Sequence, residues 1–222
     1  MLVTGPNGKR ATLAAHWSPN HGFGLGTRLD GARDMSALLA YLLAIGSPTH
    51  PIAPRCWRDG WLAGCRRLDV ADNTLLACPP LARQLYAHGW LDLAGQRDTA
   101  ADYFRNSRLA IRANRDYCRT NLFRESGLWG LSAVQGPRGY REYGYPPLQG
   151  PVAEDRVLCP PAAAACRHLT PIGAAEVTAA FLGEHRDVLS GPYGLYDAFR
   201  PPDGWVMPDY LAPHQGNLLL HL

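Results

Sequence analysis

Apolar residues spaced three and four positions apart, in stretches that end at glycine or proline, constrain this fold more than any other feature. This spacing predicts amphipathic helices, whereas apolar and polar residues alternate convincingly over no more than four positions. The class is therefore mainly α, with about seven helices joined by long loops. The expected helices cover residues 34–45, about 54–66, about 80–91, 98–119, 161–168, 174–189 and a last stretch from about 208 onward. Residues 1–33 are expected to be irregular.

The longest expected helix, 98–119, mixes apolar and basic side chains on one face. The residues of that face are Ala101, Phe104, Arg108, Ile111, Arg115 and Cys118. Since arginines on such a face are poorly suited to an apolar core, we expect it to line something polar. In the helix at 174–189, the spacing places Val177, Phe181 and Val188 on the inward face.

Composition excludes several classes of protein. The chain has 222 residues, 46% of them hydrophobic, and a formal net charge of +3 with scattered basic residues. These numbers suit one large domain or two small ones, and they argue against nucleic acid as a partner. No apolar run has the length of a membrane segment, and residues 1–10 lack the apolar stretch of a secretory signal. The protein is therefore expected to be cytoplasmic, unless the true start lies upstream.

The six cysteines do not have the spacing of a metal site. They stand at positions 56, 65, 78, 118, 159 and 166, without a C-x-x-C pair and without ligand spacing to a histidine. A zinc site is therefore not expected. Two alternatives remain open: up to three disulfides if the protein is exported, and thiols, buried or on the surface, if it is not.

The stretch 123–199 alternates aromatic rings, glycines and carboxylates in loop-like segments. It contains Leu-Trp-Gly-Leu-Ser-Ala at 128–133, Gly-Tyr-Arg-Glu-Tyr-Gly-Tyr at 139–145, and Tyr-Gly-Leu-Tyr-Asp-Ala-Phe at 193–199. Flat rings stack on sugar rings, and carboxylates take hydroxyl hydrogen bonds or move protons, so the stretch suits an oligo- or polysaccharide. The alternative is a set of aromatic turns that pack over a core.

Several motifs, in order from residue 16 to the C-terminus, resemble those of the glucoamylase-like family of glycoside hydrolases. The run LLAIGSPTHP at 42–51 is nearly identical to the family's LLALGSPTHP, and His-Trp-Ser-Pro at 16–19 looks like part of its W-x-P-x-x-G-F. Further matches are Asp-Tyr-Phe-Arg-Asn-Ser-Arg at 102–108, Trp-Gly-Leu-Ser-Ala at 129–133, the pair at 154–155 and the run at 193–199. The family includes β-1,2-glucan-degrading enzymes and a domain of cyclic β-1,2-glucan synthases.

The resemblance implies an (α/α)6 toroid, of which this chain matches the C-terminal half. We therefore interpret residues 1–222 as one domain, a partial toroid with 1–15 as an irregular lead-in and 16–222 as the matching region. The uncovered helix faces of such a half predict self-association, or pairing with an N-terminal half encoded elsewhere. The family also implies a periplasmic or secreted protein if the true start lies upstream. No cofactor or metal is implied.

Departures from the family pattern fall on polar positions. The glutamate of R-W-x-G-Y-x-E, the expected acid, is matched by Asp34, and the acid of T-A-x-D is matched by Gln135. The acid of G-I-D-Q-G becomes His214, and the asparagine of Y-G-F-x-D-A-F-N becomes Arg200. These changes predict a recognisable fold with a weakened site, that is, either a weak hydrolase or a non-catalytic glycan-binding or degenerate fragment.

Inverting hydrolysis of a β-linked glucan needs one acid and one carboxylate that activates water. The catalytic candidates are Asp34, Glu154 and Asp155; the alternatives are a helix cap for Asp34 and a solvated loop for the pair. Asp197 is a candidate for sugar binding, with a loop-organising role as its alternative. The further binding candidates are Arg28, Trp129, Glu142, Tyr193, Trp205 and Gln215, where core packing is the alternative for the tryptophans and Tyr193.

Overall fold

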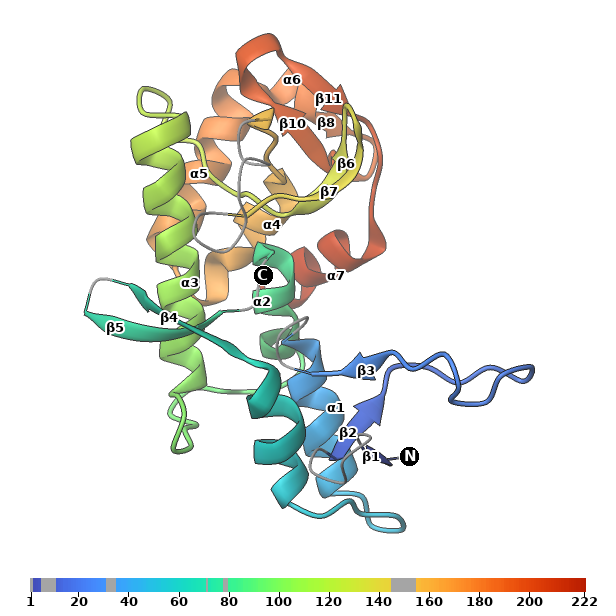
Figure 1. The fold of residues 1–222 in the computed structure, drawn as a ribbon. Helices are drawn as coiled ribbons and strands as arrows, with labels where there is room; N and C mark the ends of the chain where they lie inside the picture. The colour runs from blue at the N-terminus through green and yellow to red at the C-terminus, as the bar shows by residue number, and fades with distance from the viewer. Residues whose placement is uncertain (1, 5–10, 31–34, 71, 78–79, 145–154) are drawn as a thin grey trace.

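The computed structural model describes the chain except for residues 1, 5–10, 31–34, 71, 78–79 and 145–154. Figure 1 shows an upper part, which holds α3 to α7 and most of the short hairpins, above a lower part built on α1. The α-helices are α1 (Ser36–Ile45), α2 (Leu81–Leu85), α3 (Tyr103–Tyr117), α4 (Pro160–Ala164), α5 (Pro171–Glu184), α6 (Arg186–Leu189) and α7 (Ala212–Leu220). Short 3-10 or π-helical turns are Trp57–Leu62, Tyr86–Gly89, Cys118–Leu122, Ala165–His168 and Pro201–Asp203.

Short antiparallel strands join these helices. The strands are β1 (Leu2–Thr4), β2 (Ala11–Ala14), β3 (Arg28–Leu29), β4 (Arg66–Val70), β5 (Asn73–Ala77), β6 (Ala133–Gly136), β7 (Gly139–Glu142), β8 (Ser190–Gly191), β9 (Gly194–Leu195), β10 (Ala198–Arg200) and β11 (Trp205–Met207). Strands β1, β2 and β3 form one sheet, and the others pair as two-stranded hairpins. Between β2 and β3 the chain extends away from the body (Figure 1). Helices remain the main elements, as predicted.

Helix α3 is the central element of the upper part, and its sequence explains why. The Asp102 carboxyl accepts a hydrogen bond from the Arg105 backbone N–H, which caps the first turn. On the buried face, Asn106 donates to the Leu76 carbonyl at 2.9 Å and accepts from the Leu76 N–H at 2.7 Å. These two bonds attach strand β5 to the helix, because they satisfy backbone groups that β4 leaves unpaired.

Two large apolar clusters form the core. One gathers side chains of α2 to α7 and the β6–β7 hairpin around Trp129, Tyr143, Phe181 and Phe199. The other packs α1 and the turn Trp57–Leu62 around Tyr41 and Trp61, and it forms much of the lower part in Figure 1. The prediction of one domain over 1–222 stays a prediction.

Several sequence expectations are wrong in detail. The sequence shows no convincing alternation over more than four residues, yet β4 and β5 have five residues each. Three of the five residues of β4 are exposed, and Leu68 and Val70 are only half-buried, so the strand has no fully buried face that would mark it in the sequence. Residues 11–14 and 28–29, expected to be irregular, form β2 and β3.

The expected helix 174–189 is also different in the structure. Helix α5 begins earlier, at Pro171, and ends at Glu184, because His185 leaves helical geometry and α6 starts a new turn. The break turns Val188 outward, where it is 47% exposed, so its predicted inward position is wrong, whereas Val177 and Phe181 are buried as predicted. The last helix begins at Ala212 and not near 208.

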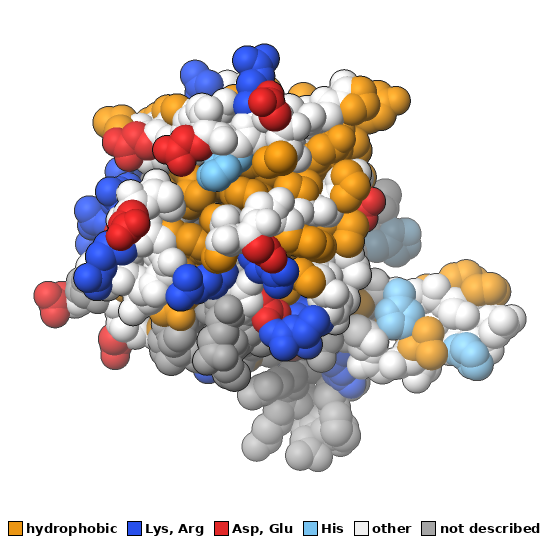
Figure 2. Space-filling view, turned by 90° about the horizontal axis from the view of Figure 1, so that it is seen from above, with side chains coloured by type: hydrophobic (Ala, Val, Ile, Leu, Met, Phe, Trp, Pro, Cys, Tyr) orange, Lys and Arg blue, Asp and Glu red, His pale blue; other side chains and the backbone are white. Residues whose placement is uncertain are grey.

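Several large apolar side chains are exposed on the surface of the helices. Leu43 of α1 is 65% exposed, Leu182 of α5 39%, and Leu219 of α7 72%. Figure 2 views the end of the molecule that carries α6 and β11, and it shows a broad band of hydrophobic side chains bordered by charged groups. Within the described residues, no helix has both the length and the apolar character to cross a membrane.

The cysteines are thiols in the part of the chain that the structure describes. Cys56, Cys118, Cys159 and Cys166 are buried, Cys65 is half-buried, and none of the five is bonded to another. Cys78 lies outside the described residues. Burial raises the pKa of Cys65 and of Cys118 to about 12, so these thiols are protonated and unreactive at neutral pH.

Candidate functional site

A pocket of about 370 Å³ lies where α2, the β6–β7 hairpin and α7 meet. Helix α2 and the turn after it contribute Arg83 and Tyr86, strand β7 contributes Tyr140, and α7 contributes His214 and Asn217. The remaining lining residues, Pro80, Ala82, Ala133, Leu211 and Pro213, are small or apolar. Two phenol rings, a guanidinium and an imidazole around a modest volume are the composition expected of a site for a polar organic ligand.

Arg83 of α2 lines one wall of the pocket, and it forms an ion pair with Glu142 of β7, which lies outside the lining. Tyr140 stands two residues before Glu142, so both side chains leave the same face of β7. The Tyr140 ring is 57% exposed, which leaves it free to contact a ligand. This wall therefore offers a guanidinium from α2 and an aromatic face from β7, with the Glu142 carboxylate paired to the guanidinium.

The floor of the pocket is a buried hydrogen-bonded pair, His214 and Asp197. His214 Nδ1 lies 2.6 Å from Asp197 Oδ1, and since a carboxylate only accepts, the imidazole donates this bond. The two residues are 5% and 1% exposed. Asp197 is fixed by its own N–H, which donates to the Asp209 carbonyl at 3.0 Å, while the second carboxyl oxygen, Oδ2, is buried without a described partner.

Cys159 completes this buried group from a third segment. A short bridge between Leu158 and Phe199 brings the start of α4 beside the Asp197 segment, and Cys159 Sγ lies 3.5 Å from His214 Nδ1. Burial raises the pKa of the Cys159 thiol, and the neighbouring His214 acts in the opposite direction. Burial alone lowers the pKa of His214, but the contacts with Cys159 and the Asp197 carboxylate outweigh it and raise that pKa above its ordinary value. The imidazole is therefore held as a cation at neutral pH.

The same three residues are the described group that could hold a metal ion. The ligand atoms of Cys159, Asp197 and His214 all lie within 4.8 Å of one another. Two ligands of a tetrahedral zinc ion, each bound at about 2.0–2.2 Å, keep roughly 3.3 Å apart. The 2.6 Å between Nδ1 and Oδ1 is shorter than this and fits a hydrogen bond. The spacing of cysteines and histidines in the sequence does not indicate this group, because its three members are distant along the chain.

Of the three catalytic candidates, Asp34 and Glu154 lie outside the described residues. Helix α1 itself begins at Ser36, and its N-cap, Met35, makes no side-chain cap. Asp155 is buried and forms ion pairs with Arg138 and Arg141, and the Tyr143 hydroxyl donates to it at 3.2 Å. This carboxyl anchors the β6–β7 hairpin and is absent from the lining of the pocket described above.

The aromatic candidates occupy three different environments. Trp129 is 2% exposed and packs in the upper core, so its ring has the packing role of the alternative interpretation. Trp205 is half-buried on β11, with the Arg200 guanidinium 5.9 Å from its ring centre. Tyr193 is 80% exposed beside Tyr210, at 5.4 Å between ring centres. Tyr193 is thus available to a ligand, although it lies outside the lining of the pocket.

The polar binding candidates are also separated. Arg28 of β3 donates to the Thr12 hydroxyl at 3.2 Å, in the β1–β3 sheet and not at the pocket. Gln215 donates to the Leu195 carbonyl at 2.9 Å and thereby holds the segment before Asp197. Glu142 and Asp197 each pair with a residue that lines the pocket, Arg83 and His214 respectively, although neither belongs to the lining itself.

Sequence reasoning missed Arg83, Tyr140 and the contribution of His214 to the site. A weak signal was present: Tyr140 and Glu142 alternate in a short hairpin closed by Gly139, whose φ is +98°. His214 stood out as a departure from the family motif, but the sequence does not show that it lies beside Asp197. That contact depends on the docking of α7 against α4, which is a tertiary feature.

Comparisons with known proteins agree with this architecture. The family model Glycoamylase, described as "Putative glucoamylase", matches residues 31–222. The chain belongs to this family. An endo-β-1,2-glucanase from Chitinophaga pinensis, solved with sophorotriose and glucose, superposes with a TM-score of 0.83 at 27% identity, over 95% of this chain and 52% of that one. A putative glucoamylase from Bacteroides fragilis gives a TM-score of 0.82 at 29% identity, over 95% and 51%.

A characterised relative in the same family extends the comparison. The exo-β-1,2-glucooligosaccharide sophorohydrolase (non-reducing end) of Parabacteroides distasonis is 25% identical over 228 residues. The alignment includes 90% of this chain but 31% of that protein. The chain therefore spans about a third of this relative and about half of the solved structures above. The resemblance seen in the sequence is confirmed, including its restriction to part of the family domain.

Proposed function

We propose that this chain is part of an (α/α)6-toroid glycoside hydrolase domain that binds a β-linked glucan, β-1,2-glucan in particular, in the pocket between α2, β7 and α7. The observation that carries the proposal is the buried Asp197–His214 pair under a pocket lined by two tyrosines and an arginine. Tyrosine rings stack on pyranose faces, while Arg83 and Glu142 provide a donor and an acceptor for hydroxyl groups. The endo-β-1,2-glucanase and sophorohydrolase relatives support the linkage.

His214 has the chemistry of a proton donor. Its Nδ1–H is engaged by Asp197, so the cationic ring has its second N–H left to donate to a sugar oxygen at the pocket. Asp34 stays the alternative candidate for the acid, and Glu154 is the proposed carboxylate that activates water. Aspartate at 34 is one methylene shorter than the family's glutamate, and misplacement of about 1 Å can cost roughly 10²-fold in rate. We therefore propose weak hydrolysis by an acid/base route.

A non-catalytic glycan-binding role is the second candidate. It is favoured by Asp155, whose carboxyl is tied up in ion pairs and not presented to the pocket. A histidine where the family has an acid also suits binding better than turnover. Under this alternative the pocket keeps its affinity for glucan while hydrolysis is absent.

Binding and turnover should be measured separately on the same protein. Calorimetric titration with β-1,2-glucooligosaccharides, with β-1,3-glucooligosaccharides as the linkage control, tests recognition, and a reducing-sugar assay tests hydrolysis. We expect binding of the β-1,2-linked oligomers, lost in Tyr140→Ala and kept in Tyr193→Ala, which is exposed but outside the pocket.

Catalysis is then tested with carboxylate and imidazole variants. Hydrolysis that falls in His214→Gln and Asp34→Asn, with oligosaccharide binding retained, supports the hydrolase. Binding without turnover supports the second candidate. A protein that binds no β-glucan at all would contradict both.

A further inference from the structure

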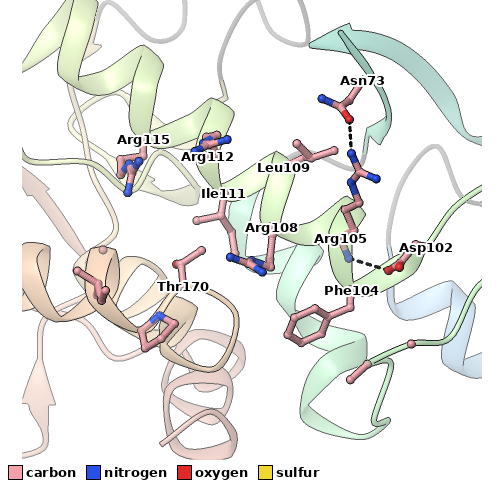
Figure 3. Close-up of a pocket in the computed structure, with 15 residues that line it drawn as sticks. Asn73, Asp102, Phe104, Arg105, Arg108, Leu109, Ile111, Arg112, Arg115 and Thr170 are labelled. Atoms are coloured by element: carbon pink, nitrogen blue, oxygen red, sulfur yellow. Dashed lines mark hydrogen bonds between the residues drawn. The ribbon is translucent and has the colours of Figure 1, made fainter. Parts of the chain in front are cut away.

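A second pocket, of about 720 Å³, is lined by four arginines from a single helix. Arg105, Arg108, Arg112 and Arg115 follow one another along α3 at spacings of three and four residues, which keeps them on one side of the helix. Figure 3 shows Arg108 pointing toward the segment that carries Thr170, while the Arg105 guanidinium points away from it to Asn73. Phe104 and Ile111 line the same pocket, so the face that the sequence predicts to border something polar does border a cavity.

Two of these arginines have no partner that the structure describes. Arg105 donates to the Asn73 side chain at 2.6 Å, and Arg115 lies 3.5 Å from Asp116. Among the described residues, Arg108 and Arg112 form no hydrogen bond or ion pair, and both are exposed. Neighbouring cations without counterions repel one another, so this surface is electrostatically incomplete without an anion.

The opposite wall of the pocket is also positive. Helix α5 begins there at Pro171, its N-cap Thr170 makes no side-chain cap, and its first turn contains no acid. Pro171 has no N–H, and the Ala174 N–H donates to the Thr170 carbonyl, so the N–H groups of Ile172 and Gly173 are the donors left at the positive end of the helix dipole. Arg115 approaches this turn closely: a side-chain carbon added at Gly173 would lie 3.1 Å from Arg115 Nη1. A cation beside a helix N-terminus is unfavourable unless an anion lies between them.

The acidic residue in the pocket lining does not neutralise the positive charge of Arg115 and the first turn of α5. It is Asp102, whose carboxyl already accepts from the Arg105 N–H as the cap of α3. The pocket also has an apolar side, since Ile172 is 75% exposed and Phe104 is half-buried. Its volume lies within the range of about 300–1,000 Å³ typical of small-molecule sites, which is far more than a lone phosphate fills. A ligand with an anionic group and an apolar organic group would therefore match the positive and the apolar parts of the pocket.

We infer that this pocket binds an organic phosphate or sulfate ester, with the oxyanion held by Arg108, Arg112, Arg115 and the first turn of α5, and the organic group against Ile172. Guanidinium forks match the oxygens of phosphate and sulfate in paired hydrogen bonds. The site is separate from the glucan pocket, since the two share no lining residue. Its occupant is therefore not the neutral β-glucan of the proposed function.

Calorimetric titration of the whole chain with phenyl phosphate and phenyl sulfate tests the inference, with inorganic phosphate and phenol as matched probes for the head and the body. We expect both esters to bind more tightly than either matched probe, and to bind more weakly as ionic strength rises. The double variant Arg108→Gln/Arg112→Gln should weaken ester binding by about tenfold or more, because it removes charged donors from the oxyanion.

The control is Arg186→Gln, which removes an equal charge from exposed α6, and it should bind like the parent. Circular dichroism of each variant confirms the fold. The inference is overturned if the parent binds neither ester, or if the double variant folds and binds both as the parent does. Equal binding of inorganic phosphate and phenyl phosphate would overturn the assignment of the organic group.

Discussion

His214 and Asp197, seventeen positions apart along the chain, form a buried hydrogen bond of 2.6 Å beneath the α2–β7–α7 pocket. Neither side chain is more than 5% exposed. Moving such a pair out of water is costly, and what compensates is the attraction between its members. Loss of one partner should therefore be far more damaging than loss of both.

The first prediction is a coupled pair of mutants. Asp197→Asn leaves the imidazole without a carboxylate and should lower the free energy of unfolding by about 3–5 kcal/mol. Asp197→Asn combined with His214→Gln should be less destabilised than the sum of the two single variants, in urea denaturation followed by circular dichroism. Asp187→Asn, an exposed acid on α6, serves as the neutral control. Additive losses would show that the pair contributes no mutual stabilisation.

The second prediction concerns stability between pH 6.5 and 8. Because the folded-state pKa of His214 is raised, the folded protein holds this proton more tightly than the unfolded chain. The stabilisation is fully present below the ordinary histidine pKa of about 6.5 and is lost as pH rises through the raised value. One proton corresponds to a slope of at most about 1.4 kcal/mol per pH unit.

The comparison with His214→Gln isolates this contribution. The difference in unfolding free energy between parent and variant should shrink as pH rises across this window. The window ends below the range in which the buried thiols begin to ionise in the unfolded chain, at about 8.5. A difference that stays constant with pH would show that His214 does not change its charge on folding.

The third prediction separates a core aromatic residue from a binding one. Trp129→Ala should lower the free energy of unfolding by about 3–5 kcal/mol, because the ring is 2% exposed in the upper core. Tyr140→Ala, at a ring that is 57% exposed, should change stability little and weaken glucan binding by about 1–3 kcal/mol. Thermal melts and calorimetric titration of the same samples measure both quantities. If Trp129→Phe folds normally but loses binding, the packing role assigned to Trp129 is incorrect.

The spacing of apolar residues in the sequence predicted most helices, because residues three and four positions apart lie on the same face of a helix. The residues 103–117 of α3 carry a clear apolar and polar division, and Asp102 is a good cap, so this helix was predictable from local rules. The β4–β5 hairpin was not, since β4 is mostly exposed and its turn depends on Asp72, whose φ is +62°. Short strands stabilised by contacts with a helix leave little trace in their own sequence.

The candidate site was predictable in its residue types but not in its contacts. Glu142 lies in strand β7 and Asp197 just before β10, and each pairs with a residue that lines the pocket. Their partners, Arg83 and His214, come from helices 59 and 17 residues away. Trp129 lies in the same aromatic-rich stretch, 123–199, but its ring packs into the core, because the local sequence does not specify which way a loop side chain points.

The last prediction concerns acid. His88 is 7% exposed, its Nε2 lies 2.8 Å from the Ser107 hydroxyl, and its Nδ1 is buried without a described partner. Burial lowers the pKa of His88 to about 4, and the nearby His221 and His168 act in the same direction. Since the unfolded chain takes up this proton first, stability is complete above about pH 6.5 and is lost as pH falls toward 4, by roughly 3 kcal/mol. His88→Gln keeps a hydrogen-bonding group for Ser107 without a titrating ring, so its unfolding free energy should fall less steeply between pH 6.5 and 4 than that of the parent. His50→Gln, at an exposed histidine, should follow the parent. Equal slopes in all three proteins would show that His88 is already protonated, or solvated, in the folded state.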